Sequence, residues 1–376
     1  MAEADAPAYQ RLVGALRSRE PGPSLIVVGG IHGNEPAGLR AAQRVLGRMA
    51  EVPLRGELVV LAGNVRALRL GLRYQRRDLN RQWSARALLP PPAGVDADPD
   101  DAERLEQAEL RTALDEAVAR ARGPVAFLDL HTTSADGIPF VMVGDTLRHR
   151  AFARAFPLPL ILGLEEQLDG VLSEYMTARG CVTLACEGGQ HQSPAAADNL
   201  EALLWLALSA AGLVDASRVP EHEAAWAHLD RARHGLPRVI EVLFRHPVVP
   251  EDEFVMEPGF ANIAPVRSRQ VVARDRRGEL RAPSDGMILL PLYQVQGADG
   301  FFFGRAVGPL AEEAAVLARR LHLDRLLPLM PGVRPRGDAL ALDRRAAERY
   351  PMALFRLFGF RQAIAGEAGE LVLRRR

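Results

Sequence analysis

Apolar residues recur along the first two hundred positions in four short runs separated by polar segments. Each run is short enough to be a buried strand. The runs occupy residues 24–30, 56–63, 124–130 and 181–187. Between them, residues 34–49 and 100–121 place apolar side chains at helical spacing, and in the second segment acids lead and arginines trail, as the helix dipole favours. This alternation predicts an α/β fold, a sheet layered by helices.

The pattern changes near residue 238, beyond a helical stretch at 197–214 that we expect to close the α/β part. Short strand-like runs follow, separated by Gly, Pro and Asp turn signals: 237–249, 269–275, 285–296 and 300–307. We predict three parts, an α/β domain over 1–237, an all-β domain over 238–330 and an Arg-rich extension over 331–376. Residues 86–104, rich in Pro and Asp, are expected to form a loop.

Composition excludes several classes of function. The 47 basic residues balance 47 acidic ones, whereas a binder of nucleic acid or of an anionic membrane usually carries a basic excess. All 47 basic residues are arginines, so neither a Schiff-base lysine nor a Walker-type phosphate-binding lysine is available. We therefore expect neither a nucleic-acid nor a membrane partner.

Cysteine content and the terminal segment indicate the compartment. Only Cys181 and Cys186 are present, which is too few for a disulfide framework or a Cys-rich zinc site. The first ten residues are polar and acidic and lack the apolar core of a signal peptide. No stretch approaches the roughly 18 apolar residues of a membrane span. We expect a cytoplasmic protein.

Polar side chains follow the first and third apolar runs. His32 and Glu35 come after 24–30, and His131 comes after 124–130. Strand ends in open α/β sheets are where ligands bind, and two imidazoles with a carboxylate form a catalytic zinc set that leaves one position for water. His32 and Glu35 alone are equally typical of a capping histidine and a first-turn glutamate before Pro36. His131 in the same context favours the metal site.

The fourth run ends at another carboxylate, Glu187. A buried carboxylate is costly unless it has a partner or a function. Beside a zinc-bound water it could act as general base and then pass the proton to a leaving amine. Taken alone, Glu187 is better explained as a helix cap or an ion-paired residue. His191, four residues later, is expected to line a pocket or the surface.

Arginines crowd the segment that follows the second run, with a single acid, Asp78, among them. They are Arg66, Arg69, Arg73, Arg76, Arg77 and Arg81. Bidentate binding of a substrate carboxylate is one use for them, and Asn80 could add a neutral hydrogen bond. The alternative is a solvated helix face whose charge is offset by the acidic segment 96–106.

Taken together, these residues resemble the succinylglutamate desuccinylase/aspartoacylase family, which is related to the zinc carboxypeptidases. The matching motifs lie in family order between residues 25 and 200: GGIHGNE, GN-RA, RY…DLNR, DLHTTS and a Glu–Gly strand exit. Residues 245–307 match the family's C-terminal domain more loosely. The resemblance implies a zinc-carboxypeptidase-like mixed sheet flanked by helices and followed by a smaller all-β domain.

Several roles are implied by this resemblance. His32, Glu35 and His131 match the ligands of one zinc ion per chain, and Glu187 matches the catalytic glutamate. Arg73 matches the arginine that polarises the scissile carbonyl and stabilises its oxyanion.

The resemblance also implies a reaction and a substrate. Asn80 and Arg81 match the pair that binds a substrate carboxylate. The implied reaction is hydrolysis of the amide bond of a small anionic N-acyl amino acid. Whether the chain forms a homo-oligomer is left open.

Two departures from the aspartoacylase pattern bear on specificity. A further carboxylate-binding arginine is absent, since its equivalent falls near Thr177, with Arg179 out of register. The family tyrosine contributed by the β domain is absent too, because that region contains Phe301 to Phe303. We therefore expect a less acidic or more apolar substrate than N-acetylaspartate.

Three other functions fit parts of this pattern. A metallocarboxypeptidase on the same scaffold would bind a peptide's terminal carboxylate with Arg81. A binding protein could keep the zinc fold without turnover. Anion or nucleic-acid binding through 66–81 would weaken steeply with salt.

Overall fold

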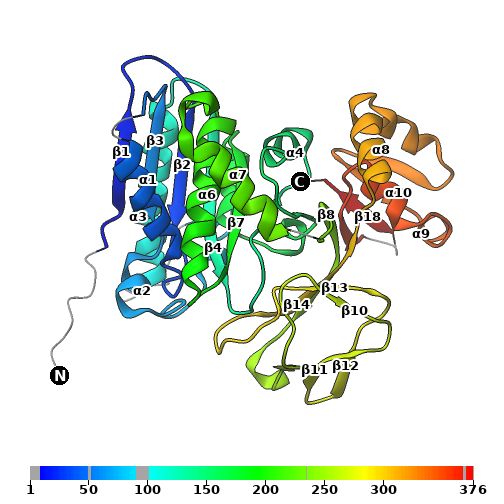
Figure 1. Ribbon diagram of the computed structural model, residues 1–376. Coiled ribbons are helices and arrows are strands. Elements are labelled where there is room, and N and C mark those ends of the chain that lie inside the picture. Colours follow the sequence, from blue (N-terminus) through cyan, green and yellow to red (C-terminus); the bar gives the residue numbers. More distant parts are fainter. Residues whose placement is uncertain (1–8, 50–51, 90–100, 234, 367–369, 376) are drawn as a thin grey trace.

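A mixed sheet of eleven strands forms the body of this computed structural model (Figure 1). The structure describes residues 9–49, 52–89, 101–233, 235–366 and 370–375. The strand order is β1-β3-β2-β4-β7-β5-β6-β8-β14-β13-β10. The strands are β1 (Leu12–Arg17), β2 (Ser24–Gly29), β3 (Glu57–Ala62), β4 (Val125–Thr133), β5 (Phe140–Val143), β6 (Leu160–Leu162), β7 (Val182–Gln190), β8 (Val239–Pro247), β10 (Ala264–Val266), β13 (Gly286–Leu289) and β14 (Asp299–Ala306). The predicted mixed α/β architecture is confirmed.

Helices cover both faces of the first half of this sheet. Alternate side chains of β2 point to opposite faces: Leu25 and Val27 join an apolar cluster with α1 (Ala37–Arg48) and α6 (Pro194–Ala210). Ile26 and Val28 join a second cluster on the other face with α3 (Ala102–Arg120) and α5 (Leu172–Ala178). The strands are therefore buried on both sides, which explains why their sequences are continuously apolar.

Two central strands are longer than their apolar runs. β4 continues to Thr133 and β7 to Gln190. His131 and Glu187 therefore lie inside these strands, whereas the sequence pattern predicted them at the strand ends. The two strands are parallel neighbours, and His131 and Glu187 are direct partners across the pair. The apolar pattern stops early because the last residues of both strands line a polar cleft.

Four further strands extend the sheet beyond β6. β8 pairs with β6, and β14, β13 and β10 follow, while β9 (Val255–Met256), β11 (Val271–Asp275) and β12 (Gly278–Arg281) form a separate three-stranded sheet. One helix, α7 (Pro220–Arg233), was not predicted by the hydrophobic pattern. It follows the predicted helical stretch 197–214 and packs on α6. This helix buries only two apolar side chains, Ala225 and Leu229, so its pattern is weak.

The segment after residue 308 folds around an apolar cluster of its own. Its four-stranded sheet has the order β15-β16-β18-β17, and its cluster includes Leu342, Phe355 and Leu373. The elements are α8 (Pro309–Arg320), β15 (Val333–Arg336), β16 (Ala339–Leu342), α9 (Arg344–Arg349), α10 (Met352–Leu357), β17 (Gln362–Ala365) and β18 (Leu371–Arg374). The domain boundaries at 237/238 and 330/331 stay predictions.

Two other sequence expectations meet the described residues only in part. Of the expected loop at 86–104, residues 90–100 lie outside the described part of the chain, and α3 begins at Ala102. None of the helices in the described part is long and apolar enough to cross a bilayer.

A buried ion cluster attaches the C-terminal segment to the main sheet. Asp145, just after β5, receives Nε of Arg150 at 2.6 Å and both Nη atoms of Arg319 at 2.8 Å, and it also contacts Arg361. Burial alone would raise the pKa of Asp145, but the guanidinium groups, led by Arg361, hold that pKa well below its ordinary value. Asp145 is therefore an ionised anchor.

We expect Asp145→Asn to lower the free energy of unfolding by about 3–5 kcal/mol, because it leaves buried guanidinium groups without their counter-charge. The depressed pKa gives the sign of the pH effect. The contribution of Asp145 is complete above its unfolded-state pKa of about 3.9 and is lost as the pH falls through the lower folded-state value. Urea unfolding as a function of pH measures both effects.

The matched control is Asp198→Asn, which removes an exposed ion pair with Arg44. Its expected cost is about 0–1 kcal/mol. Equal costs for the two variants would contradict the anchoring role of Asp145.

Candidate active site

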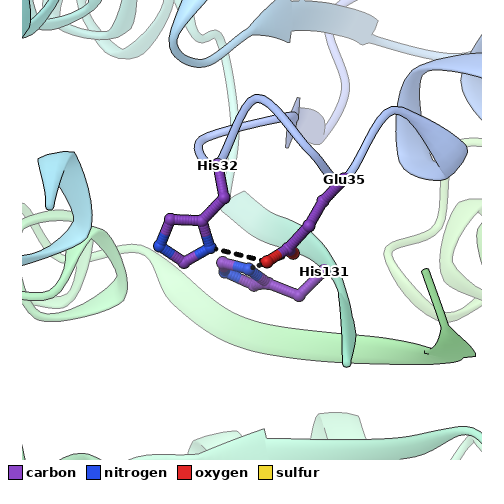
Figure 2. Close-up of side chains that lie close together, drawn as sticks. All are labelled: His32, Glu35 and His131. Carbon is purple, nitrogen blue, oxygen red and sulfur yellow. Dashed lines mark hydrogen bonds and ion pairs between the residues drawn. The ribbon is translucent and has the colours of Figure 1, made fainter. Parts of the chain in front are cut away.

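Three side chains converge at the edge of the sheet where β2 and β4 end (Figure 2). His32 lies in the loop after β2, Glu35 lies two residues before α1, and His131 lies in β4. His32 Nδ1 is 2.9 Å from Glu35 Oε1, and His131 Nδ1 is 3.2 Å from Glu35 Oε2. One ligand atom from each lies within 4.8 Å of the others, so the three could hold one metal ion.

The outer ring nitrogens of both histidines face carboxylates. His32 Nε2 lies 3.0 Å from Asp78 Oδ1, and His131 Nε2 lies 3.0 Å from Asp129 Oδ2. Metal-binding histidines commonly donate their second N–H to a carboxylate, which fixes the tautomer and turns the other nitrogen to the ion. Both Nδ1 atoms are thereby directed at the point that Glu35 also faces. The donor set and its orientation fit zinc.

The opposite charges of Glu35 and the two histidines stabilise one another. Burial alone would raise the pKa of Glu35, but His32 and His131 hold it well below its ordinary value. Burial alone would lower the pKa of His131, but Asp129 and then Glu35 raise it well above the ordinary value. The pocket therefore stabilises positive charge at the point where the three side chains meet.

Glycine at position 33 is required by packing. A Cβ there would lie 2.2 Å from the carbonyl carbon of Ala67, inside the helix α2 (Val65–Leu70). The Gly33 N–H donates to the Arg73 carbonyl at 3.1 Å, so this loop and the loop carrying Arg73 hold each other in place. The motif His-Gly-Asn-Glu thus combines two donor residues with the close approach that presents them.

Glu187 lies beside this cluster on β7. Its side chain is buried, and within the described part of the chain its Oε2 atom has no hydrogen-bond partner. Burial, the largest cause, raises the pKa of Glu187 to about 8. A carboxyl group whose pKa lies near neutral pH, and one of whose oxygens has no hydrogen bond to the protein, can accept and return a proton.

Arg73 reaches the same place from the loop after α2. Its Nη1 donates to Glu35 Oε1 at 3.2 Å and its Nη2 to Asp78 Oδ2 at 3.1 Å. Burial alone would lower its pKa, but Asp78 and then Glu35 raise it. A fixed cation therefore stands next to the converging ligands.

Asn80 and Arg81, in a short 3-10 helix (Leu79–Arg81), also line the cleft. Asn80 is held by Leu172, whose N–H donates to Asn80 Oδ1 at 2.8 Å. Arg81 Nη2 donates to Asp299 Oδ2 at 2.8 Å. Asp299 also contacts Arg245, so one carboxylate serves two guanidinium groups.

The remaining arginines of the 66–81 segment have other partners in the described residues. Arg66 pairs with Glu106 and Glu109, and Arg77 pairs with Asp101. The acidic segment thus offsets part of this charge, as the alternative interpretation held, while Arg73 and Arg81 belong to the cleft.

Both polar and apolar side chains line the cleft. His191 belongs to its wall, 2.7 Å from Thr132 Oγ1 through Nδ1 and 3.2 Å from Gln294 Oε1 through Nε2. Its apolar wall includes Met142, Leu164, Leu168, Val171, Ala185, Leu290 and Phe302. A ligand would therefore have its polar groups at the donors and an apolar group against this wall.

The two departures have visible consequences. Arg179 pairs with Asp115 at 2.7 Å and stacks 3.4 Å above the Tyr175 ring, and it is not among the residues that line the cleft. Of the three successive phenylalanines, only Phe302 faces the cleft, because neighbouring side chains of β14 alternate.

Sequence reasoning missed the residues that complete the site from a distance. Asp129 lies two positions before His131, inside the motif DLHTTS, and this spacing was a usable signal, because alternate residues of a strand share a face. Asp299 and Gln294 come from the second half of the chain and have no motif. Asp299 begins β14, which pairs with β8, and Gln294 lies in the loop before β14; both line the cleft.

Comparison with known proteins agrees with this geometry. The succinylglutamate desuccinylase/aspartoacylase catalytic domain matches residues 21–209. A succinylglutamate desuccinylase from Burkholderia thailandensis is 28% identical over 262 residues, covering 67% of this chain and 70% of that protein.

Solved structures share the fold. A succinylglutamate desuccinylase/aspartoacylase from Rhodobacter sphaeroides has a TM-score of 0.56 at 18% identity, covering 78% of this chain and 88% of that one. The succinylglutamate desuccinylase from Chromobacterium violaceum has a TM-score of 0.53 at 19% identity, covering 77% and 86%.

Proposed function

Because the chain belongs to the succinylglutamate desuccinylase/aspartoacylase family, we propose that it is a zinc-dependent hydrolase of N-acyl amino acids. The observation that carries this proposal is the convergence of His32, Glu35 and His131 beside Glu187 in a buried cleft. When bound by these three ligands, one zinc ion would lower the pKa of a coordinated water to roughly 7 and polarise the acyl carbonyl.

The protein's own groups then divide the work. Glu187 removes a proton from the attacking water through its unengaged carboxylate oxygen as the water oxygen bonds to the acyl carbon. It returns that proton to the amide nitrogen as the carbon–nitrogen bond breaks, which frees a carboxylate and an amine. Arg73 donates hydrogen bonds to the oxygen on which negative charge develops.

Asn80 and Arg81 hold the substrate by its carboxylate. Arg81 offers a planar pair of donors, the geometry that a carboxylate prefers. In the structure Arg81 is paired with Asp299, so a substrate carboxylate competes with or joins this pair. Arg81 and Arg245 share Asp299, so the two guanidinium groups keep one net positive charge, which matches a single substrate carboxylate.

The apolar wall extends this argument to the rest of the substrate. Met142, Leu168 and Phe302 offer no donors to an acidic side chain. We therefore assign the enzyme to N-acyl amino acids whose side chain or acyl group is apolar.

The nearest alternative is a metallocarboxypeptidase acting on short peptides. The second half of the chain contributes a wall of the cleft: Leu290, Pro291, Leu292, Gln294, Gly297, Ala298 and Asp299. This wall favours a compact N-acyl amino acid over a peptide.

The test is a substrate panel combined with metal analysis. We expect purified protein to contain about one zinc ion per chain, and N-acyl amino acids with apolar groups to be hydrolysed faster than N-acetylaspartate or peptides. Chelation should abolish turnover and zinc should restore it. A clear preference for N-acetylaspartate would refute the proposed specificity, and turnover of peptides alone would refute the deacylase.

Replacing Arg81 with glutamine should raise KM by about 10–100-fold, because a charge-assisted hydrogen bond to the substrate is worth about 1.5–3 kcal/mol. The kcat should change much less if Arg81 binds the carboxylate equally in the ground and transition states. Steady-state kinetics on the best N-acyl substrate measures both constants. Arg86→Gln, at an exposed position in the same segment, is the control and should leave both unchanged.

A further inference from the structure

A second concave site lies where the C-terminal segment packs against the main sheet. Figure 1 shows this segment on the other side of β8 from the three-stranded sheet. It encloses about 510 Å³. Apolar side chains of α8 and α10 form part of its wall. The charged residues that line it are Arg150, Arg305, Arg356, Arg361, Glu241 and Glu312. We call it the arginine hollow.

Positive charge in the arginine hollow exceeds negative charge. Glu241 is the shared partner of three guanidinium groups: Arg361 at 2.7 Å, Arg305 at 3.2 Å and Arg356 at 3.6 Å. The next carboxylate behind the wall, Asp145, is already engaged by arginines.

Two further acids, Glu312 in the wall and Glu166 beside Asp145, do not neutralise this positive charge. Glu312 pairs with Arg154, outside the arginine hollow, at 3.5 Å. Burial raises the pKa of Glu166, beside Asp145, and the charge of Asp145 raises it further, which disfavours the ionised form. The arginine hollow therefore keeps uncompensated positive charge.

Arg356 is the arginine with the weakest protein partners. Its Nε lies 3.6 Å from Glu241 Oε1, and within the described part of the chain its Nη atoms have neither a hydrogen bond nor an ion pair. Burial, together with Arg361 and Arg305, lowers its pKa, although Glu241 opposes this shift. A partly buried guanidinium group that lines a cavity, and whose Nη atoms make no hydrogen bond within the described residues, is open to a ligand anion.

We propose that the arginine hollow binds a small oxyanion carrying two or more negative charges, either a phosphate or a polycarboxylate. Arg356 supplies a donor pair of the geometry that both kinds of anion accept. Arg305, whose Nε and Nη2 donate to Glu241, adds positive charge beside it. The apolar part of the wall accommodates the carbon skeleton of an organic ligand.

One segment of the chain borders both the arginine hollow and the candidate active site. Leu162, in the wall of the arginine hollow, ends β6, and Leu164 and Leu168 of the following loop line the cleft. Gly163, between them, lies against Arg361. The segment 162–168 therefore contributes to the walls of both sites.

The experiment is calorimetric titration of the full-length protein with inorganic phosphate and, separately, with tricarballylate, at ionic strength held constant with chloride. We expect saturable binding of one of the two anions, and the anion that binds identifies the source. Arg356→Gln should weaken this binding by about tenfold or more, as expected for loss of a charge-assisted hydrogen bond. Arg344→Gln, at an exposed position in α9, should not change it.

Anions can also enter the candidate active site, so Arg81→Gln is titrated in parallel. Binding kept in Arg81→Gln and weakened in Arg356→Gln supports the proposal. Binding lost in Arg81→Gln but kept in Arg356→Gln places the anion in the cleft and overturns it, as does absence of saturable binding to the unmodified protein. If Arg356→Gln does not fold, Arg305→Gln, whose side chain is 48% exposed, takes its place.

Discussion

Replacing Glu187 with glutamine is expected to lower kcat by about 10²–10⁴-fold, the range that a positioned acid/base group contributes. Glutamine keeps the size of the side chain and removes its ability to take a proton from water. Since Glu187 is not one of the three converging ligands, zinc content should be unchanged. Steady-state kinetics together with metal analysis of the same preparation measures both quantities.

A stability measurement separates this chemical effect from misfolding. The raised pKa of Glu187 means that the metal-free folded state holds a proton that the unfolded state has already lost. Folding of the metal-free protein should therefore lose stability as the pH rises from about 4.5 to about 8. The metal-free Glu187→Gln variant should lack this loss.

Glu116→Gln, at an exposed position in α3, is the control and should match the unmodified protein in rate and stability. Full activity of Glu187→Gln would exclude Glu187 as general base. Loss of zinc along with activity would instead make Glu187 a part of the metal site.

Removing one of the proposed metal ligands should have the largest effect. His131→Gln removes one of the three proposed ligands. Loss of a residue that only hydrogen-bonds a ligand already lowers metal affinity by about 10–100-fold. We therefore expect zinc affinity to fall by more than about 100-fold. The loss of zinc removes several kcal/mol of transition-state stabilisation, on the order of 10³-fold or more in kcat. Zinc titration against a competing chelator and turnover under zinc excess measure the two effects.

His222→Gln, in α7 and not among the residues that line the cleft, is the matched control. It should bind zinc and turn over substrate like the unmodified protein. A His131→Gln protein that retains stoichiometric zinc and near-normal turnover would remove His131 from the ligand set and with it the proposed mechanism.

Much of the fold was predictable because its cause is local. The four continuous apolar runs became β2, β3, β4 and β7, since strands covered by helices on both faces need apolar residues at every position. The long helical segments became α1, α3 and α6, because their apolar side chains pack against the sheet. α7 escaped prediction because it buries little apolar surface.

The candidate ligands were also readable from the chain. His32, Glu35 and His131 follow apolar runs, and parallel neighbours in a sheet end at the same edge, so proximity followed from the order of the strands. The partition of the arginines did not follow in this way. Arg66 and Arg73 have similar surroundings in the sequence, yet one pairs with α3 and the other faces Glu35.

The sequence by itself thus determined the α/β layers and the candidate metal-binding residues, because short-range periodicity and the polar residues that follow the apolar runs are local features of the chain. Only the tertiary structure decided what surrounds them. Asp299 reaches Arg81 across more than two hundred positions, and Asp145 joins Arg319 and Arg361 of the C-terminal segment. Such pairings depend on how distant elements pack, since a charge finds its partner through space and leaves no pattern in the residues beside it.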